Sequence, residues 1–348
     1  MSRSSQKRSI ALTYNCKSRK SALSQAERMD EAEFDEEEVI EKIISELKSL
    51  GLVVYPVEAN EEAYITLHKL KNTVDMVFNF AEGLHGRDRE AQIPAMLEML
   101  EIPYTGGPPI SYALALDKAL CKEVLAYNQI PTPLWQVVKS PKDSLSADLK
   151  FPLIVKPVAE GSSKGIYADS LVYTAEKLAR AIARVSAQYK HRVLVEEYLE
   201  GREFTVGVLG TPFRVLPIVE VVFDDLPDGV PKFDHYEAKW IYDSPGKALD
   251  PLVCPAKISK ELGMQIETQV LCASKVLRLR DWARFDIRLN GKGAPHILEV
   301  NCPPGILPDP DANSRFPRAA FADGLTFKEL LAEVLNSCWM RYKGEVFC

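Results

Sequence analysis

The sequence predicts an α/β protein in which a parallel sheet with crossover helices is followed by smaller parts of mixed α+β character. Short apolar runs at 10–14, 52–57 and 74–80 are typical of buried strands, and a segment with helical spacing separates the first two. Because strand–helix alternation of this kind favours parallel pairing, we expect one sheet here. Near residue 106 the chain turns sharply and the strand-like runs become shorter, which indicates a domain boundary.

Length and composition describe an ordinary folded protein. The chain has 348 residues, 46% hydrophobic and 26% charged, which excludes a disordered or fibrous chain and fits about two or three domains. The net charge of −6 does not suggest a nucleic-acid-binding protein. The N-terminal apolar run is too short for a signal peptide, and no stretch approaches the roughly 18 apolar residues of a membrane span. Seven scattered cysteines without a C-x-x-C pair favour free thiols, so we expect a cytoplasmic protein without nucleic-acid or membrane partners.

The first expected helix follows an acidic segment, residues 27–38, and ends at Gly51. We interpret the acidic run as a solvent-facing helix start, because negative charge is favourable near a helix N-terminus. The later elements are expected as a helix, four strands, a second helix and a hairpin, at 111–127, 134–138, 153–156, 193–197, 204–209, 260–279 and 283–301. A long loop is expected at 224–247.

The hairpin at 283–301 carries the most informative polar pattern. Asn290-Gly291 is a turn signal between two runs in which apolar and polar residues alternate. Matching the apolar faces of the two strands brings together Arg284, Asp286, Glu299 and Asn301. The same parity places Ile297 with the polar residues and Leu298 with the apolar ones. Because acid opposite acid is destabilising on a solvated face, and Mg²⁺ prefers oxygen ligands, this face is a candidate metal–nucleotide site. An exposed polar face is the alternative.

A second segment, 151–165, is suited to binding an anion. An apolar strand ends at Lys156, and a loop of small residues follows at 160–165. Successive backbone N–H groups of such a loop can surround a phosphate, and a lysine on the strand adds a positive charge. The loop lacks the Walker A spacing, and an ordinary flexible connection is the alternative.

A third segment, 193–206, pairs an apolar strand with acidic groups. Glu196 and Glu197 end the strand, and Glu203 follows the turn at Gly201. Such groups can accept hydrogen bonds from an adenine amino group and from ribose hydroxyls. Taken alone, the segment also fits a plain strand, turn and strand.

Together these segments resemble the ATP-grasp superfamily, and more closely its D-alanine–D-alanine ligase branch. The resemblance covers about residues 75–335 and includes IPYTGG (102–107), LALDKALCK (114–122), YEAKW (236–240) and EVNCPPG (299–305). It implies three parts: a Rossmann-like N-terminal domain at 1–106, a central ATP-grasp subdomain at 107–195, and a C-terminal ATP-grasp subdomain with the metal site at 196–348.

The resemblance also implies roles for the matching residues. Those implied to bind ATP are Lys118, Lys156, Glu160, Gly161, Ser162, Ser163, Gly165, Glu196, Glu197, Leu199, Glu203 and Lys239. Those implied to bind two Mg²⁺ ions, with Mn²⁺ as a substitute, are Asp286, Glu299 and Asn301. Those implied to be catalytic are Arg284, Ser162 and Gly305. Among these, the lysines hold phosphates, Glu203 binds the ribose, and the loop 160–165 closes over the phosphates.

The implied activity is that of an ATP-dependent carboxylate–amine ligase, which forms a peptide bond through an acyl phosphate. D-Alanine–D-alanine ligation is the first named activity that the resemblance suggests. Ligation of other amino acids or peptides by the same mechanism is the alternative, and an ATP-binding regulatory protein without catalysis is a third reading. The partners expected are small amino-acid or peptide substrates and a second copy of the chain in a homodimer.

Four departures from the family pattern concern the amino-acid pockets. No residue in 15–39 matches the glutamate that binds the first amino acid, and AEGLHGRDREAQ (81–92) replaces an H-G-x-x-G-E-D motif. Trp240 replaces a tyrosine that forms a loop-closing hydrogen-bond set with Ser162. PPGILPDPDA (303–312) replaces a Ser-Leu pair that binds the second substrate. We therefore expect altered pockets for both substrates beside intact nucleotide and metal sites.

Overall fold

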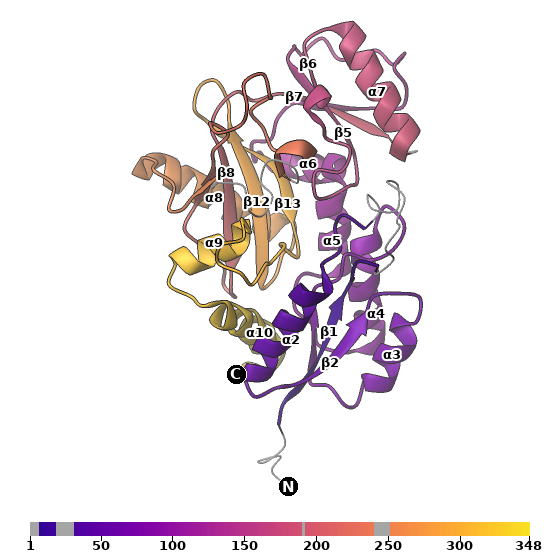
Figure 1. The fold of residues 1–348 in the computed structure, drawn as a ribbon, viewed down its shortest axis with the longest axis vertical. Coiled ribbons are helices and arrows are strands. Elements are labelled where there is room, and N and C mark those ends of the chain that lie inside the picture. The colour runs from indigo at the N-terminus through magenta and orange to yellow at the C-terminus, as the bar shows by residue number, and fades with distance from the viewer. Residues whose placement is uncertain (1–6, 19–30, 190–191, 240–250) are drawn as a thin grey trace.

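The computed structural model describes residues 7–18, 31–189, 192–239 and 251–348. Within these ranges the chain forms three sheets. Figure 1 shows the N-terminal sheet at the lower end of the molecule, the sheet of the middle region at the upper end, and the C-terminal sheet between them on the left. The mixed α/β architecture confirms the predicted fold class.

The N-terminal sheet is parallel, with its strands in the order β2-β1-β3. The strands are β1 (Ser9–Tyr14), β2 (Val53–Glu58) and β3 (Met76–Asn79), and the flanking helices are α2 (Glu37–Ser49), α3 (Ala63–Leu70) and α4 (Gln92–Leu100). Alternate residues of β1 face opposite sides of the sheet. Leu12 packs in the core that contains α2, whereas Ala11 packs in the core that contains α3 and α4. Helices therefore cover both faces, as a parallel sheet requires.

The sheet of the middle region is antiparallel, in the order β4-β7-β5-β6. Its strands are β4 (Trp135–Val138), β5 (Leu153–Pro157), β6 (Leu171–Val172) and β7 (Val193–Glu197). Helix α7 (Ala175–Tyr189) covers one face, where Ile182 and Val185 pack with Val155 and Val195. Because consecutive residues of β5 alternate, Lys156 is directed away from this core.

The C-terminal sheet has the order β11-β10-β8-β12-β13, with β9 paired to β8. Its strands are β8 (Glu203–Leu209), β9 (Arg214–Val215), β10 (Val219–Val221), β11 (Leu252–Val253), β12 (Trp282–Leu289) and β13 (Pro295–Asn301). Helix α8 (Lys260–Val276) covers one face, where Ile266 and Val270 pack with Phe285 and Ile287 of β12. The opposite, polar side of β12 is left to form a site.

The helix expected at 111–127 is divided in the structure into α5 (Pro109–Leu116) and α6 (Lys118–Tyr127), so that prediction was wrong in one respect. Asp117 between them has an extended backbone, and its carboxylate accepts hydrogen bonds from the N–H groups of Ala119 and Leu120. This cap satisfies donors that a helix start leaves without partners. The break makes Lys118 the first residue of α6, where its N–H donates to the carbonyl of Val158.

The two C-terminal helices pack against the N-terminal part of the chain. Helices α9 (Arg315–Ala322) and α10 (Phe327–Lys343) follow the last sheet, and α10 lies beside α2 (Figure 1). Leu335 of α10 and Phe316 of α9 share a core with Leu12 of β1. In addition, the buried Asp281 accepts hydrogen bonds from the N–H of Gly106 and from Arg341. The N-terminal part thus packs against the C-terminal part through a shared core and these hydrogen bonds.

All seven cysteines are free thiols, which confirms the expectation from their spacing. In the part of the chain that the structure describes, no helix has both the length and the apolar character needed to cross a bilayer.

Candidate active site

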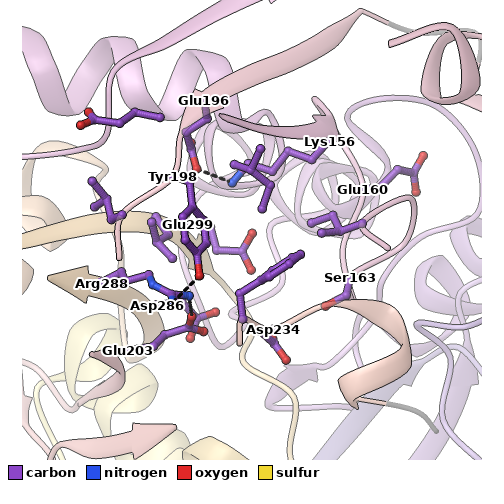
Figure 2. Close-up of a pocket in the computed structure, with 16 residues that line it drawn as sticks. Lys156, Glu160, Ser163, Glu196, Tyr198, Glu203, Asp234, Asp286, Arg288 and Glu299 are labelled. Carbon is purple, nitrogen blue, oxygen red and sulfur yellow. Dashed lines mark hydrogen bonds and ion pairs between the residues drawn. The ribbon is translucent and has the colours of Figure 1, made fainter. Parts of the chain in front are cut away.

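A cavity of about 640 Å³ lies between the middle sheet and the C-terminal sheet (Figure 2). Many of the residues predicted to bind nucleotide or metal line it, namely Lys156, Glu160, Ser163, Glu196, Glu197, Leu199, Glu203, Asp286 and Glu299. The apolar residues of its wall include Ile154, Ile166, Phe233 and Leu298. A wall that combines apolar residues with charged ones suits a purine base joined to a charged chain.

The hairpin of β12 and β13 brings the predicted metal ligands together. Asp286 is paired directly with Glu299, and Arg284 with Asn301. The side-chain amide of Asn301 donates to Oδ2 of Asp286 at 3.2 Å. The apolar alternation of the two strands therefore predicted this register correctly at the end of the hairpin where the acids lie.

The register changes beyond Asp286, and there the parity prediction was wrong. Ile287 is paired with Ile297, so Leu298 is an extra residue in β13. Ile297 is fully buried in the core, whereas Leu298 lines the cavity beside Glu299. A bulge of this kind reverses the alternation of a strand locally, because two residues on one strand then oppose one on the other.

Asp286 lies in a strongly positive environment. Arg284 donates to both of its carboxylate oxygens, at 3.2 and 2.9 Å, and Thr205 donates at 2.7 Å. Burial opposes ionisation of Asp286, but Arg284 and the nearby Arg315 outweigh it and hold the pKa of this carboxyl well below its usual range. Asp286 is therefore a carboxylate at neutral pH.

The donor set on this face fits a magnesium ion bound to a nucleotide. Asp286 and Glu299 supply carboxylate oxygens, and Asn301 can supply an amide oxygen. Among the described residues no three His, Cys, Asp or Glu side chains group into a complete metal site. Magnesium commonly takes one or two carboxylates and completes its shell with phosphate oxygens and water, so an incomplete protein shell is what such a site requires.

Lys118 joins this face to the loop 160–165, called the glycine-rich loop below. Its Nζ lies 3.2 Å from Oε2 of Glu299 and donates to the carbonyl of Glu160 at 2.6 Å. Burial opposes the charged form of Lys118, but Glu299 outweighs it and raises the pKa of the ammonium. The lysine therefore keeps its charge at the point where the loop meets the proposed metal ligands.

Lys156 belongs to a buried ionic triad that the sequence reasoning identified only in part. Its Nζ contacts Oε1 of Glu196 at 2.8 Å, and Lys122 contacts Oε2 of the same carboxylate at 2.6 Å. Lys122 also donates to Thr132 at 2.8 Å. Together the two lysines outweigh burial and lower the pKa of Glu196. The only sequence signal for Lys122 is its place one helical turn after Lys118.

Arg288 is a second residue that the sequence reasoning left without a role. It donates to Glu203 at 2.7 Å and to the hydroxyl of Tyr198 at 2.9 Å, as the dashed lines in Figure 2 show. Its guanidinium also lies over the ring of Tyr198. Strand parity signals this position, because Arg288 shares a face with Asp286. The arginine thus fixes Glu203 and Tyr198 side by side in the cavity wall.

The glycine-rich loop has an unusual backbone. Ser162 and Ser163 have φ angles of 48° and 58°, and Gly165 has 77°. Left-handed conformations of this kind cost about 1–3 kcal/mol per non-glycine residue and cluster at ligand clamps. Ser163 lines the cavity, whereas Figure 2 shows the carboxylate of Glu160 turned away from the other acids. That carboxylate pairs with Lys164 at 2.9 Å instead.

A second cavity of about 430 Å³ adjoins the first, and Asp234 lines both. Lys239 lines this second cavity together with Arg315, which pairs with Asp234 at 2.9 Å. Burial lowers the pKa of Lys239; Asp234 opposes the shift, and Arg315 adds to it. Val221, Phe223, Leu226 and Pro251 form the apolar part of the wall. Lys239 is thus placed beside, and not within, the larger cavity.

Of the other predicted residues, Gly161 and Ser162 lie in the loop, and Gly305 is exposed on the loop after β13. Trp240 lies outside the described residues. In the region 15–39, which offered no match from sequence, Glu33 contacts the glycine-rich loop: its carboxylate accepts from the N–H of Gly161 at 2.7 Å. No local pattern signals this contact, because Gly161 lies 128 residues further along the chain.

The smaller middle sheet, which carries Lys156 and Glu196, and the larger C-terminal sheet, which carries Asp286 and Glu299, enclose the cavity, and this architecture is that of the ATP-grasp fold. A family model described as "D-ala D-ala ligase C-terminus" matches residues 123–336. The chain belongs to the D-alanine–D-alanine ligase family, whose members are ATP-dependent, ADP-forming carbon–nitrogen ligases.

Individual relatives agree with this assignment. The chain is 32% identical over 313 residues to the uncharacterized protein y4sG of Sinorhizobium fredii, covering 88% of this chain and 89% of that protein. It is 35% identical over 291 residues to the D-alanine–D-alanine ligase of Aquifex aeolicus, covering 83% and 91% of the two chains. A crystal structure of D-alanine–D-alanine ligase from Bacillus anthracis has the same fold, with a TM-score of 0.70 at 23% identity, covering 97% of this chain and 99% of that one.

Proposed function

We propose that this chain activates a carboxylate with ATP and joins it to an amine, so that a peptide bond forms through an acyl phosphate. The single observation that carries this proposal is the convergence of Asp286, Glu299 and Asn301 on one wall of the cavity, with Lys118 in contact with Glu299. Carboxylates, an amide and a charged lysine together suit a metal-bound triphosphate whose terminal phosphoryl group is transferred.

The nucleotide occupies the larger cavity in this proposal. The ribose hydroxyls donate to Glu203, and the adenine lies at the segment of Glu196, Glu197 and Leu199, which lines the same cavity. Lys118 and Lys156 bind the phosphates, with the loop 160–165 above them and Lys239 toward the terminal phosphate. Asp286, Glu299 and Asn301 would hold two magnesium ions, or manganese ions in their place, and such ions would supply positive charge to the phosphates during phosphoryl transfer.

The chemistry follows from a poor leaving group. A carboxylate does not react with an amine at neutral pH, because an oxide cannot leave. When the γ-phosphoryl group of ATP is transferred to the carboxylate, ADP is released and the leaving group becomes phosphate. The amine then attacks the carbonyl carbon, and phosphate departs as the amide forms. Arg284, with a backbone N–H near Gly305, stabilises the oxyanion of this step, while the loop with Ser162 excludes water.

The substrates are small amino acids or short peptides, with D-alanine as the reference substrate of the family. We propose that the amine substrate lies in the second cavity, because Arg315 in its wall offers positive charge to the carboxylate of this substrate. The wall of this cavity combines the Arg315–Asp234 ion pair with the apolar side chains of Phe223 and Leu226. Such a wall favours an amine substrate larger than alanine. This observation supports the alternative that D-alanine is not the exclusive substrate.

We further propose that the chain is divided functionally at 1–106, 107–195 and 196–348, and that it acts as a cytoplasmic homodimer. Its seven free cysteines support the reducing compartment, and the family resemblance supports the dimer. Sedimentation of the purified chain tests the dimer directly.

The experiment that tests the function is an ADP-release assay with ATP, magnesium and a panel of single and paired amino acids and dipeptides, both enantiomers included. The proposal expects ADP release that depends on at least one amino acid, together with a ligated product found by mass spectrometry. If ATP binds but no member of the panel stimulates ADP release, the hypothesis of an ATP-binding regulatory protein without catalysis replaces the ligase proposal.

A further inference from the structure

A buried ionic cluster lies beside the proposed active site and holds the glycine-rich loop. We define the Glu33 cluster as Glu33, Arg89, Glu160, Gly161 and Lys164. Nη2 of Arg89 lies 3.0 and 2.7 Å from the two oxygens of Glu33, and Nζ of Lys164 lies 2.8 Å from one of them. The side chains of Arg89, Glu33 and Lys164 are only 8%, 4% and 7% exposed.

The cluster connects three segments that are far apart in sequence. Glu33 precedes α2, Arg89 begins the short 3₁₀ helix η1 (Arg89–Ala91), and Lys164 lies in the loop that follows β5. Arg89 also donates to the carbonyl of Ala159 at 3.3 Å and lies 3.6 Å from the carboxylate of Glu160. Arg89 therefore contacts the chain at 159–160, where the loop begins, and Glu33, the acid that anchors the loop.

Gly161 explains how Glu33 approaches the loop so closely. A Cβ atom at this position would come within 2.2 Å of Oε1 of Glu33. Only glycine leaves room for the carboxylate to accept from the backbone N–H at 2.7 Å. Gly161 thus allows the loop to bind Glu33. The two residues that follow it, Ser162 and Ser163, have the strained left-handed backbone described above.

Glu33 has no acceptor capacity left for a substrate. Each of its oxygens has two donor atoms within 3.0 Å, from Gly161, Arg89 and Lys164. A carboxylate offers about four lone-pair positions, and here all of them are directed to protein groups. The carboxylate therefore acts as an anchor for the loop and does not bind a substrate ammonium in this arrangement.

We propose that Arg89 is a positioning residue that holds Glu33 against the glycine-rich loop, so that the loop stays closed over the acyl phosphate until the amine attacks. This inference rests on the proposed ligase function. If the loop opens early, water attacks the acyl phosphate in place of the amine, which returns the carboxylate and phosphate. ADP then forms without ligated product. The predicted signature of a weakened cluster is therefore uncoupling, with little change in substrate binding.

The test compares Arg89→Lys and Arg89→Met with the unmodified chain. Lysine keeps the charge but cannot reach two oxygens and the Ala159 carbonyl at once, so it should restore the coupling only in part. We expect the ratio of ligated product to ADP to fall about tenfold in Arg89→Met, equivalent to about 1.4 kcal/mol of weaker closure. The KM of the carboxylate substrate should change by less than about threefold, because Arg89 does not contact it.

Arg214→Lys is the matched control, because Arg214 also pairs with two acids, Asp323 and Glu333, but these belong to the C-terminal helices and not to the loop. It should leave the ratio unchanged. Lys164→Met removes the cation that the loop itself contributes to the cluster, and it should also lower the ratio of ligated product to ADP. This variant keeps the test possible if Arg89→Met fails to fold. An unchanged ratio in folded Arg89→Met and Lys164→Met would overturn the inference.

A second measurement separates this inference from the proposed function. The dissociation rate of a fluorescent, non-hydrolysable ATP analogue with magnesium reports loop opening without any turnover. We expect it to rise in Arg89→Met and not in Arg214→Lys. If the unmodified chain ligates nothing, the proposed function fails, yet a faster dissociation still supports the anchoring role. Equal dissociation rates in all three proteins would contradict that role.

Discussion

Asp286 of β12 lies directly opposite Glu299 of β13, acid against acid, in the wall of the larger cavity. Such a pair is destabilising unless cations neutralise it. The protein supplies two of them: Arg284 contacts Asp286 at 2.9 Å, and Lys118 contacts Glu299 at 3.2 Å. The proposed magnesium ions add the positive charge that the nucleotide phosphates also require.

The first prediction concerns these two acids. Asp286→Asn or Glu299→Gln should reduce ATP turnover by about 10²-fold or more, the scale at which one essential electrostatic group acts. The fold should persist, because each substitution is nearly isosteric. ADP release measures the effect, circular dichroism checks the fold, and Asp323→Asn on the surface is the control. Turnover within about threefold of the unmodified chain in either variant would remove the metal assignment.

Lys156→Ala should weaken nucleotide binding more than amino-acid binding. The lysine lines the larger cavity and contacts Glu196, whereas the second cavity is lined by other residues. A hydrogen bond to a charged group is worth about 1.5–3 kcal/mol, so the affinity should fall about 10- to 100-fold. Isothermal titration with a non-hydrolysable ATP analogue measures it. Unchanged affinity would exclude Lys156 from the nucleotide site.

Lys122→Met should lower the stability of the fold. Lys122 and Glu196 are both almost fully buried, and removing one partner of a buried ion pair costs about 3–5 kcal/mol. Urea unfolding measures the loss, and Lys42→Met, which removes a surface pair with Glu46, should cost less than about 1 kcal/mol. Equal effects of the two substitutions would show that the triad does not stabilise the protein.

The stability of the chain should depend on Glu33 at low pH. Burial opposes ionisation, but Arg89 and Lys164 outweigh it and lower the pKa of Glu33 from 4.5 to about 2. Because its pKa is lower in the folded state, the stabilisation is complete above about pH 4.5 and is lost as the pH falls through about 2. The contribution at stake is about 3 kcal/mol.

Glu33→Gln cannot ionise, so its free energy of unfolding should fall less steeply between about pH 5 and pH 2 than that of the unmodified chain. Denaturant unfolding at several pH values measures both curves. Parallel curves would show that the carboxylate of Glu33 is not held by Arg89 and Lys164 in solution.

D-Alanine should be a poor or non-exclusive substrate. Arg315 and Asp234 form a charged wall in the second cavity, and the carboxylate of Glu33 is already engaged by the loop. Phosphate release with D-alanine should therefore be matched or exceeded by another amino acid or dipeptide. If D-alanine alone reaches about 10⁴ M⁻¹s⁻¹ or better and nothing competes, the pockets are not altered in the way proposed.

The sequence predicted those parts of the site that depend on local alternation. Strand parity places Asp286 opposite Glu299, because the apolar faces of β12 and β13 must both meet the core. Parity failed at Ile297 and Leu298, since nothing in the local pattern marks where a bulge inserts its extra residue. The division between α5 and α6 was missed for a similar reason: an aspartate inside an apolar helix pattern is also compatible with a continuous helix.

The Glu33 cluster could not be predicted at all. Glu33 lies within an acidic run that is typical of a solvent-facing helix start, yet it is buried against Arg89 and Lys164. The packing of three segments that are distant in sequence decides which acid of the run 27–38 is buried. The pairing of Lys122 with Glu196 also could not be predicted from sequence, because Lys122 lies on α6 and Glu196 on β7.

The measurement that tests the central claim most directly follows an oxygen atom. A carboxylate substrate identified in the ADP-release panel is labelled with ¹⁸O in its carboxyl group, and the phosphate released during ligation is examined by mass spectrometry. If the carboxylate attacks the γ-phosphorus of ATP, one labelled oxygen passes to the phosphate when the amine displaces it, and Asp286→Asn releases almost no labelled phosphate. Unlabelled phosphate alongside ligated product would contradict an acyl phosphate, and with it the proposed reaction.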